Sequence, residues 1–497
     1  MKIKQVVSRL FIAALGASTL ATGAAQSVSA APSGPVKRVL LISVDGLHSS
    51  DLSSYIAANP KSTLAALAGM GVWYPNASGN KPTDSFAGLM GIVTGGTPKA
   101  TGIYYDDSYD RKLSPPGSNC STIGTEVLYD GSIDADPTRI DGGVGYDQSQ
   151  LPRNPYNGCQ VVYPHQYLRV NTIFEVAKAY GFTTAWADKH LSYEIVRGPS
   201  GGGVNDLFTP EIDSANGTTN SITKTQAYDD LKVQAVLRWI KGWDHTGAYK
   251  MTAPAIFGMN FQAVSVGQKL KGNGYTDAAG TPSKGLASSL AFVDQSLGKM
   301  VTTLKQWNQF DSTLIIITAK HGQSPIDPTQ RRIIDSNVIP GIVDGVKKGL
   351  LAQATQDDVA LLWLTDSSKT QDVVNALRAN AANAGVADIL YGDSLKAQFG
   401  DPTVDSRVPD IIVQPQIGVI YTSPKGTKLA EHGGFSQNDA NVALLIANPG
   451  LKAGVNTASV QTTQIAPTIL QSLGMDPNWL QAVKLEKTAA LPGLAMK

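Results

Sequence analysis

Four side chains of this sequence belong to the types that bind metal ions or act as nucleophiles. Asp45 follows an apolar run and precedes a glycine, and Ser85 follows a Pro-Thr-Asp segment. His321 and His432 are each followed by glycine. Carboxylates and imidazoles ligate divalent cations. A hydroxyl that starts a helix can attack phosphorus while the helix amides hold the phosphate oxygens.

Each of these residues also has a plainer interpretation when it is considered alone. Asp45 can close a turn or cap a helix. Ser85 can be a helix N-cap that only satisfies backbone amides, and a single histidine is more often structural than catalytic. The positions of the four residues relative to strands and helices must therefore decide between the two interpretations.

Apolar runs rich in β-branched residues alternate with amphipathic segments along the chain. This alternation indicates a mostly parallel sheet with helices on both faces, and ligands of such sheets bind at the carboxyl ends of the strands. Asp45 and His321 directly follow two of the expected strands, so we expect both at that edge. The pattern predicts strands at residues 38–44, 183–187, 254–261, 313–318, 410–413 and 442–447, and helices at 62–70, 171–180, 228–242, 286–306 and 463–473.

Two regions depart from this alternation. Residues 105–165 are rich in Asp, Gly, Pro, Ser and Asn, and they are expected to form a loop-rich cap. Residues 324–403 contain a small α/β pattern of their own, which we interpret as an inserted subdomain. The cap contains the two cysteines of the chain, Cys120 and Cys159, and neither has the spacing of a zinc ligand. In an oxidising compartment such a pair is expected to form a disulfide.

The first 30 residues have the layout of a secretory signal peptide. Three basic residues precede an apolar stretch at residues 10–21, which is too short to span a membrane. The mature chain is therefore expected in the periplasm or secreted, without a membrane segment. Cleavage would remove three positive charges and no acidic ones, which changes the formal net charge from +1 to −2. Such a balance provides no surface field for nucleic acid, so an anionic substrate must be held by a local site.

The order of the motifs resembles that of the type I phosphodiesterase/nucleotide pyrophosphatase family of the alkaline-phosphatase superfamily. The resemblance extends from about residue 39 to the end of the chain. It implies a three-layer α/β/α core of the alkaline-phosphatase type, in which residues 31–497 form one hydrolase domain with the cap and the subdomain as insertions. It also implies a two-zinc site and a covalent phospho-enzyme. The motifs are Asp45-Gly46, Pro82-Thr83-x-Ser85-Phe86, the glycine-rich turn that ends at Gly102, His321-Gly322 and His432-Gly433.

The resemblance assigns roles to the four side chains by position. Ser85 matches the nucleophile, and Asp45 and His321 match ligands of the zinc ion beside it. His432 matches a ligand of the other zinc ion.

Several departures from the family pattern change the expected metal site. Val264 and Gln268 stand where the family has two zinc ligands, and Lys320 stands where it has a carboxylate. Gly88 replaces an asparagine that donates to the phosphate. A unit charge pair about 4 Å apart is worth roughly 4 kcal/mol at an effective dielectric of about 20. Replacing a carboxylate by an ammonium beside a dication is therefore not compatible with a conventional two-zinc site.

We expect the altered site to hold a single divalent metal ion, with zinc favoured. Lys320 would act as a second cation that neutralises phosphate oxygens. Asp188 and His190 follow the strand expected at residues 183–187 and are candidate replacement ligands, but Asp188 can instead cap the next segment. The expected catalytic residues are Ser85, Lys320 and His432, and the expected metal ligands are Asp45, Ser85, His321 and His432.

The expected function is hydrolysis of a small phosphoester through Ser85. Two alternatives stay open at this point. The same scaffold can hydrolyse sulfate esters or phosphonates, and the loss of metal ligands can also indicate a catalytically inactive exported binding protein. Phe86, beside the nucleophile, can stack on a base or belong to the core.

Overall fold

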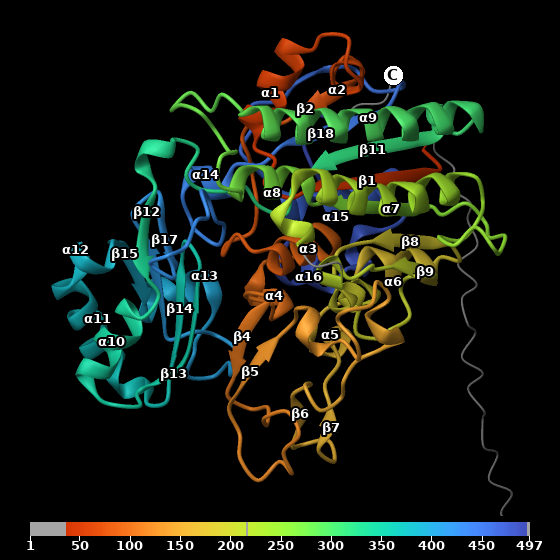
Figure 1. Ribbon diagram of the computed structural model, residues 1–497. Coiled ribbons are helices and arrows are strands. Elements are labelled where there is room, and N and C mark those ends of the chain that lie inside the picture. The colour runs from red at the N-terminus through yellow and green to blue at the C-terminus, as the bar shows by residue number, and fades with distance from the viewer. Residues whose placement is uncertain (1–35, 215–216, 495–497) are drawn as a thin grey trace, which may run out of the picture.

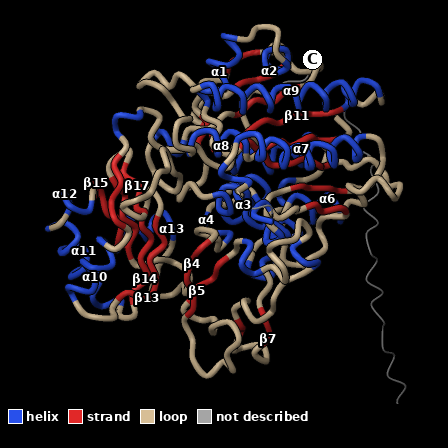
Figure 2. Tube along the Cα trace, in the orientation of Figure 1, coloured by secondary structure: helices blue, strands red, loops and turns tan. Residues whose placement is uncertain are grey.

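The structure is a computed structural model that describes residues 36–214 and 217–494. The predicted signal peptide at residues 1–30 lies outside these described residues. The main sheet consists of β1 (Arg38–Val44), β2 (Gly71–Trp73), β8 (Thr184–Ala187), β9 (Asp206–Phe208), β10 (Ile256–Phe261), β11 (Thr313–Thr318), β18 (Leu444–Ala447) and β19 (Gly454–Val455). Their order is β19-β2-β18-β11-β1-β10-β8-β9, and only β18 is antiparallel to its neighbours. Figures 1 and 2 show this sheet among helices in the upper part of the molecule. The mostly parallel sheet that the sequence predicted is therefore confirmed.

Strands β1, β10 and β11 form the centre of this sheet and are apolar along almost their whole length. Every residue of β10 and β11 is buried, as expected for strands that helices cover on both faces. Strands β8, β10, β1 and β11 are parallel and adjacent. Their carboxyl ends therefore meet at one edge of the sheet.

Helices cover the sheet in two layers, which Figure 1 shows on opposite sides of the strands. Helices α7, α8 and α9 pack against one another in one layer, and α3, α6 and α15 pack together in the other. This arrangement confirms the α/β/α architecture. Within the described part of the chain, no helix has the length and apolar composition needed to cross a membrane. The helices named here are α3 (Ser85–Thr94), α6 (Ile173–Ala179), α7 (Ile222–Ile240), α8 (Ala263–Lys269), α9 (Lys284–Gln306) and α15 (Ile465–Ser472), and others of the core are α1 (Ser49–Ala58), α2 (Thr63–Ala68), α4 (Pro98–Thr101), α14 (Gln437–Ala440) and α16 (Gln481–Glu486).

The region expected to be a cap contains short hairpins and long loops at the bottom of Figure 1. Strand β4 (Asp107–Asp110) pairs with β5 (Thr125–Leu128), and β6 (Arg153–Asn154) pairs with β7 (Gln160–Val161). A disulfide joins Cys120 to Cys159, which confirms the predicted pair. The bond ties the loop after β4 to the second hairpin.

Removing this disulfide is expected to loosen the cap and to leave the main sheet intact. The bond joins residues 39 apart, and closing a loop of that size stabilises a fold by up to about 4 kcal/mol. Limited proteolysis of a Cys120→Ser/Cys159→Ser variant should cut residues 105–165 faster than in the wild type, with unchanged resistance elsewhere. Equal cleavage rates in the two proteins would show that the cap keeps its shape without the bond.

A smaller α/β unit lies beside the main sheet, at the left of Figure 1, and has an apolar core of its own. Its sheet has the order β13-β14-β16-β15, and β12 pairs with β17. The strand expected at residues 410–413 pairs with β14 and β15 in this unit, so the insertion extends to about residue 422 instead of 403. An apolar strand pattern does not specify which sheet the strand joins. The elements are β12 (Arg332–Asp335), α10 (Val338–Val346), β13 (Leu351–Gln356), β14 (Ala360–Leu364), α11 (Thr370–Ala379), α12 (Ala381–Ala384), β15 (Val386–Tyr391), α13 (Gly392–Phe399), β16 (Ile411–Pro415) and β17 (Val419–Thr422).

Candidate active site

The predicted site residues gather at the carboxyl ends of β8, β10, β1 and β11. Asp45 follows β1, and Lys320 and His321 follow β11 after one residue. Ser85 is the first residue of α3, which belongs to the helix layer with α6 and α15. The parallel order of the strands therefore places residues from distant parts of the chain side by side.

The Ser85 hydroxyl lies between an imidazole, a carboxylate and an ammonium. Its Oγ is 3.0 Å from Nε2 of His321, 3.2 Å from Oδ2 of Asp45 and 3.2 Å from Nζ of Lys189. Ser85 itself is almost completely buried. Sequence reasoning did not identify Lys189. Lys189 could have been found from the sequence, because it follows the expected strand β8 and therefore lies at the same edge of the sheet as Asp45.

The start of α3 differs from the expectation that its amides would hold a phosphate. Asp84 is the N-cap, and its carboxylate accepts hydrogen bonds from the amides of Phe86 at 2.7 Å and Ala87 at 3.1 Å. Ser85 is therefore the first helical residue and not the N-cap, and its side chain is free to face the site. The two amides are already bound by Asp84, so this expectation is corrected.

Gly88 allows α3 to approach the segment after β11. A Cβ atom on Gly88 would lie 2.3 Å from the carbonyl oxygen of Lys320, well inside contact distance. A larger side chain at this position cannot be accommodated without moving the backbone. Gly88 is therefore required by the close packing of α3 against the segment that contains Lys320.

His321 is held as a neutral acceptor. Its Nδ1 lies 2.7 Å from the carbonyl oxygen of Gly322, and because a carbonyl only accepts, Nδ1 carries the proton and Nε2 is free to accept. Burial lowers the pKa of His321 to about 4, although Asp45 opposes this shift. The imidazole is therefore uncharged at neutral pH and can accept the Ser85 proton.

Asp45 is held as a carboxylate. Its Oδ2 accepts a hydrogen bond from the Gln262 amide at 2.6 Å and lies 3.7 Å from the Lys189 ammonium. Burial alone would raise the pKa of Asp45, but the positive charges of Lys320 and Lys189 hold it well below its usual range. This carboxylate therefore stays charged beside the nucleophile.

Lys320 pairs with Asp188, whereas the sequence predicted that it would neutralise the phosphate oxygens of a substrate. Its buried ammonium contacts both carboxylate oxygens of Asp188, at 2.9 and 3.0 Å, and lies 4.2 Å from the Tyr193 ring centroid. Asp188 also accepts hydrogen bonds from the Trp186 indole and from the Lys189 amide. Asp188 is therefore bound by the protein itself and is not positioned as a free metal ligand.

His432 packs against His321 at the edge of the site. The two ring centroids are 3.9 Å apart and the rings are tilted by 35°. Burial and the neighbouring His321 lower the pKa of His432 well below its usual value, so both imidazoles are neutral. His190 instead points to Glu211, with Nδ1 2.9 and 3.0 Å from the two carboxylate oxygens.

The position that the family uses for its second zinc ion is filled by a hydrogen-bonded network. Val264 is fully buried in the core. The Gln268 amide donates to the Gly46 carbonyl at 2.8 Å and to the Tyr275 hydroxyl at 2.9 Å, and its oxygen accepts from Gln323 at 2.5 Å. The polar atoms of Gln268 are therefore satisfied within the protein.

The donor set around Ser85 does not fit the zinc ion that the sequence predicted there. Zinc binds oxygen and nitrogen ligands at about 2 Å, so an ion shared by Asp45 and Ser85 would lie within about 4 Å of the Lys189 ammonium. Charges of +2 and +1 at about 4 Å repel by about 8 kcal/mol at an effective dielectric of about 20. The two carboxylates Asp45 and Asp188 already face the two ammonium groups of Lys189 and Lys320. A dication at this position would therefore be repelled by the Lys189 ammonium.

Among the described residues, two other groups of side chains have the spacing of metal ligands. In one, Glu431 already contacts the ammonium groups of Lys269 and Lys428 with its two oxygens. In the other, Glu211 is bound by His190. The groups are Asp357, Glu431 and His432, and His190, Glu211 and Asp213.

A cavity of about 470 Å³ opens beside the nucleophile. Lys189 and Gln262 belong both to its wall and to the contacts of Asp45 and Ser85. Its wall contains four lysines and no phenylalanine, tyrosine or tryptophan. Phe86 is not in this wall, because it packs between Tyr129 and Tyr193 in the core. The lysines are Lys189, Lys269, Lys271 and Lys428.

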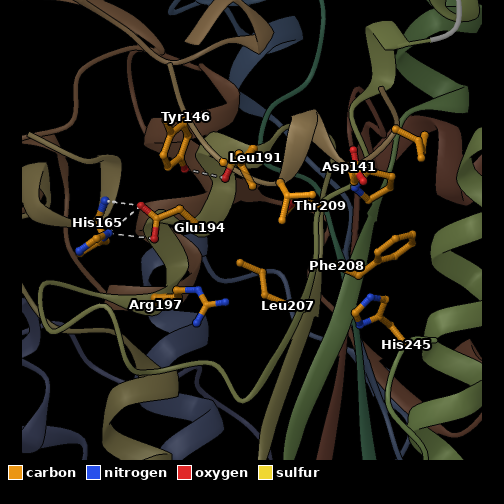
Figure 3. A pocket seen from close by; sticks show the side chains of 14 residues that line it. Asp141, Tyr146, His165, Leu191, Glu194, Arg197, Leu207, Phe208, Thr209 and His245 are labelled. Carbon is orange, nitrogen blue, oxygen red and sulfur yellow. Dashed lines mark hydrogen bonds and ion pairs between the residues drawn. The ribbon is translucent and has the colours of Figure 1, made fainter. Parts of the chain in front are cut away.

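A second cavity, of about 430 Å³, lies between the cap and β9, the last strand of the main sheet (Figure 3). Leu207 and Phe208 of β9 form one side, and Tyr146 and Leu191 form another. Its polar groups are largely engaged, since Glu194 contacts His165 across the cavity wall. None of its lining residues is among those that contact Ser85 or Asp45 through hydrogen bonds or ion pairs, so this cavity is separate from the candidate active site.

The chain matches a known family and known structures. The profile of type I phosphodiesterase / nucleotide pyrophosphatase matches residues 39–438. No curated protein sequence matches the chain. Murine ectonucleotide pyrophosphatase / phosphodiesterase 5 has a TM-score of 0.58 at 15% identity, covering 88% of this chain and 96% of that one. The alkaline phosphatase PafA has a TM-score of 0.58 at 13% identity, covering 90% and 97%.

A further structure shows an inactive variant of the same murine protein in complex with AMP. It has a TM-score of 0.57 at 15% identity and covers 88% of this chain and 96% of that one. At these identities the structures establish a shared fold.

Proposed function

The chain belongs to the type I phosphodiesterase/nucleotide pyrophosphatase family, a family of phosphoester hydrolases, and on this premise we propose that it hydrolyses small phosphoesters through a covalent intermediate on Ser85. The observation that carries the proposal is the setting of the Ser85 hydroxyl. It has a neutral imidazole acceptor on one side and an ammonium on the other, both within 3.2 Å. A hydroxyl becomes a nucleophile when a base accepts its proton and a nearby cation stabilises the oxyanion.

The proposed reaction has two steps. In the first, Oγ of Ser85 bonds to phosphorus while its proton moves to Nε2 of His321, the bond from phosphorus to the leaving oxygen breaks, and His321 returns the proton to that oxygen. In the second, water attacks the phosphoserine, gives a proton to His321 and releases phosphate, and Ser85 regains its proton. The net reaction consumes one water per ester bond.

The cavity beside Ser85 supports a small anionic substrate. Its four lysines outnumber the carboxylates that they contact, since Lys269 and Lys428 share Glu431 and Lys189 faces Asp45. A chain without a strong net charge needs such local positive charge in order to hold an anion. A nucleobase stacked on Phe86 is not proposed, because that ring is buried in the core. The murine structural neighbour in complex with AMP supports a phosphoester of modest size.

We also propose that the protein is exported, to the periplasm or beyond the cell. The amino-terminal segment has the composition of a signal peptide, and a disulfide is typical of an oxidising compartment.

Acid quenching of the enzyme during turnover tests the function directly. Incubation with p-nitrophenyl phosphate should leave one phosphoryl group on the peptide that contains Ser85, detected by mass spectrometry. Incubation with bis(p-nitrophenyl) phosphate should leave one p-nitrophenyl phosphoryl group there, because only one nitrophenolate leaves in the first step. The Ser85→Ala variant is the matched control and should carry none. Faster turnover of p-nitrophenyl sulfate than of either phosphoester would favour the sulfate-ester alternative, and no turnover of any ester would favour the binding protein.

A further inference from the structure

We propose that the Lys189 ammonium takes the place of the metal ion beside the nucleophile, so that Ser85 reacts without a bound dication. This inference rests on the proposed phosphoester hydrolase function. It assigns the cation of the reaction to Lys189, whereas the sequence pointed to Lys320.

The position of Lys189 is the first argument. Its Nζ lies 3.2 Å from Oγ of Ser85 and 3.7 Å from Oδ2 of Asp45. In the family that this chain belongs to, the nucleophile and the matching aspartate share a zinc ion, and here an ammonium contacts both groups. A lysine carries its own positive charge and three donor hydrogens, so it can neutralise the carboxylate and contact the hydroxyl at the same time.

The surrounding chain fixes Lys189 in this place. Its carbonyl oxygen accepts hydrogen bonds from the Ile212 amide at 3.0 Å and from the Tyr228 hydroxyl at 3.2 Å, which hold the backbone after β8. Asp188 would be a competing partner for the Lys189 ammonium, but Lys320 occupies both of its oxygens. The Lys320–Asp188 pair is thus closed and buried, and Lys189 remains directed at Ser85 and Asp45.

The chemistry of the step gives Lys189 a role that other groups cannot fill. The amides of Phe86 and Ala87 are bound by Asp84, so they do not hold a phosphate oxygen. His321 faces Ser85 with its acceptor nitrogen Nε2, because its Nδ1 donates to the Gly322 carbonyl. Lys189 also lines the cavity beside the nucleophile, where a substrate phosphate would enter. The ammonium can therefore stabilise the Ser85 oxyanion first and a phosphoryl oxygen in the transition state next.

Chelation of the wild-type protein is the first arm of the test. After dialysis against dipicolinate and EDTA, hydrolysis of p-nitrophenyl phosphate should continue at the untreated rate, and added ZnCl₂ should not increase it. Loss of turnover on chelation, with recovery at one equivalent of zinc, would overturn the proposal.

Substitution of Lys189 is the second arm. Lys189→Met keeps the length of the side chain and removes its charge, and kcat should fall by about 10²–10³ because one preorganised electrostatic group is lost. Lys299→Met is the control, since Lys299 pairs with Asp230 on the surface and should keep full activity. Wild-type kcat in Lys189→Met would overturn the proposal.

Zinc binding provides a third arm that does not depend on activity. Calorimetric titration with ZnCl₂ should give the same stoichiometry for the wild type and for His321→Ala, because His321 is not a zinc ligand in this protein. One tight equivalent present in the wild type and absent in His321→Ala would overturn the proposal. This arm remains decisive if Lys189→Met does not fold. It also remains decisive if no phosphoester is hydrolysed: the proposed function then fails, and the zinc titration alone decides whether a dication binds beside Ser85.

Discussion

Replacing Ser85 with alanine is expected to lower kcat for phosphoester hydrolysis by at least about 10³-fold, because the covalent step loses its nucleophile. The fold should survive the change. The lost hydroxyl contributes about 1 kcal/mol through its hydrogen bonds, and Asp45 and Lys189 remain close enough to balance each other's charge. Steady-state kinetics with p-nitrophenyl phosphate, together with urea denaturation of both proteins, measure the two effects.

Ser192→Ala is a matched control for this experiment. Ser192 is also a fully buried serine, and its hydroxyl donates to the carbonyl oxygen of Tyr129 and not to any group at the site. Its removal should cost a similar amount of stability and leave kcat unchanged. Equal kcat values for Ser85→Ala and the wild type would exclude Ser85 as the nucleophile.

Replacing Lys320 with methionine is expected to destabilise the fold by about 3–5 kcal/mol, because a buried charge loses its partner. Asp188 is fully buried, and Lys320 contacts both of its oxygens. Activity should fall as well, since an unpaired Asp188 would draw the Lys189 ammonium away from Ser85. The free energy of unfolding from urea titration and the kcat of the folded protein are the measurements.

The double variant Lys320→Met/Asp188→Asn shows whether the destabilisation comes from the unpaired charge of Asp188 or from the loss of the lysine side chain. Asparagine keeps the shape of Asp188 and an oxygen acceptor for its neighbours but removes the charge. If the unpaired carboxylate causes the destabilisation, the double variant should recover most of it and unfold within about 2 kcal/mol of the wild type. A double variant as unstable as Lys320→Met would instead assign the effect to packing around the lysine stem.

The family and the fold could be predicted because they depend on local patterns and their order. Apolar runs mark β1, β10 and β11, and Gly46 and Gly322 follow the site residues after β1 and β11. The family matching residues 39–438 and the α/β/α layers agree with these predictions. The disulfide was predictable for a similar reason, since two cysteines within one loop-rich region leave a single pairing.

The partners of the charged side chains could not be predicted in the same way. Asp188, Lys189 and Lys320 stand in two strand-end segments, and the sequence offers no rule for which lysine meets which carboxylate. The burial of Lys320 against Asp188 and Tyr193 directs Lys189 to Ser85. The capping of α3 by Asp84 is a similar case, because Asp84 and Ser85 are both good N-caps and only the path of the backbone selects one.

By itself the sequence determined which residue types meet at the edge of the sheet, because strand periodicity places Asp45 and His321 there and the family resemblance adds Ser85. Only the tertiary structure decided how their charges are balanced. Buried charges require partners within a few ångströms, and those partners come from strands more than a hundred residues apart. Lys189 therefore borders the position that a zinc ion occupies in the family. It does so because β8 ends just before it and because Lys320 already pairs with Asp188.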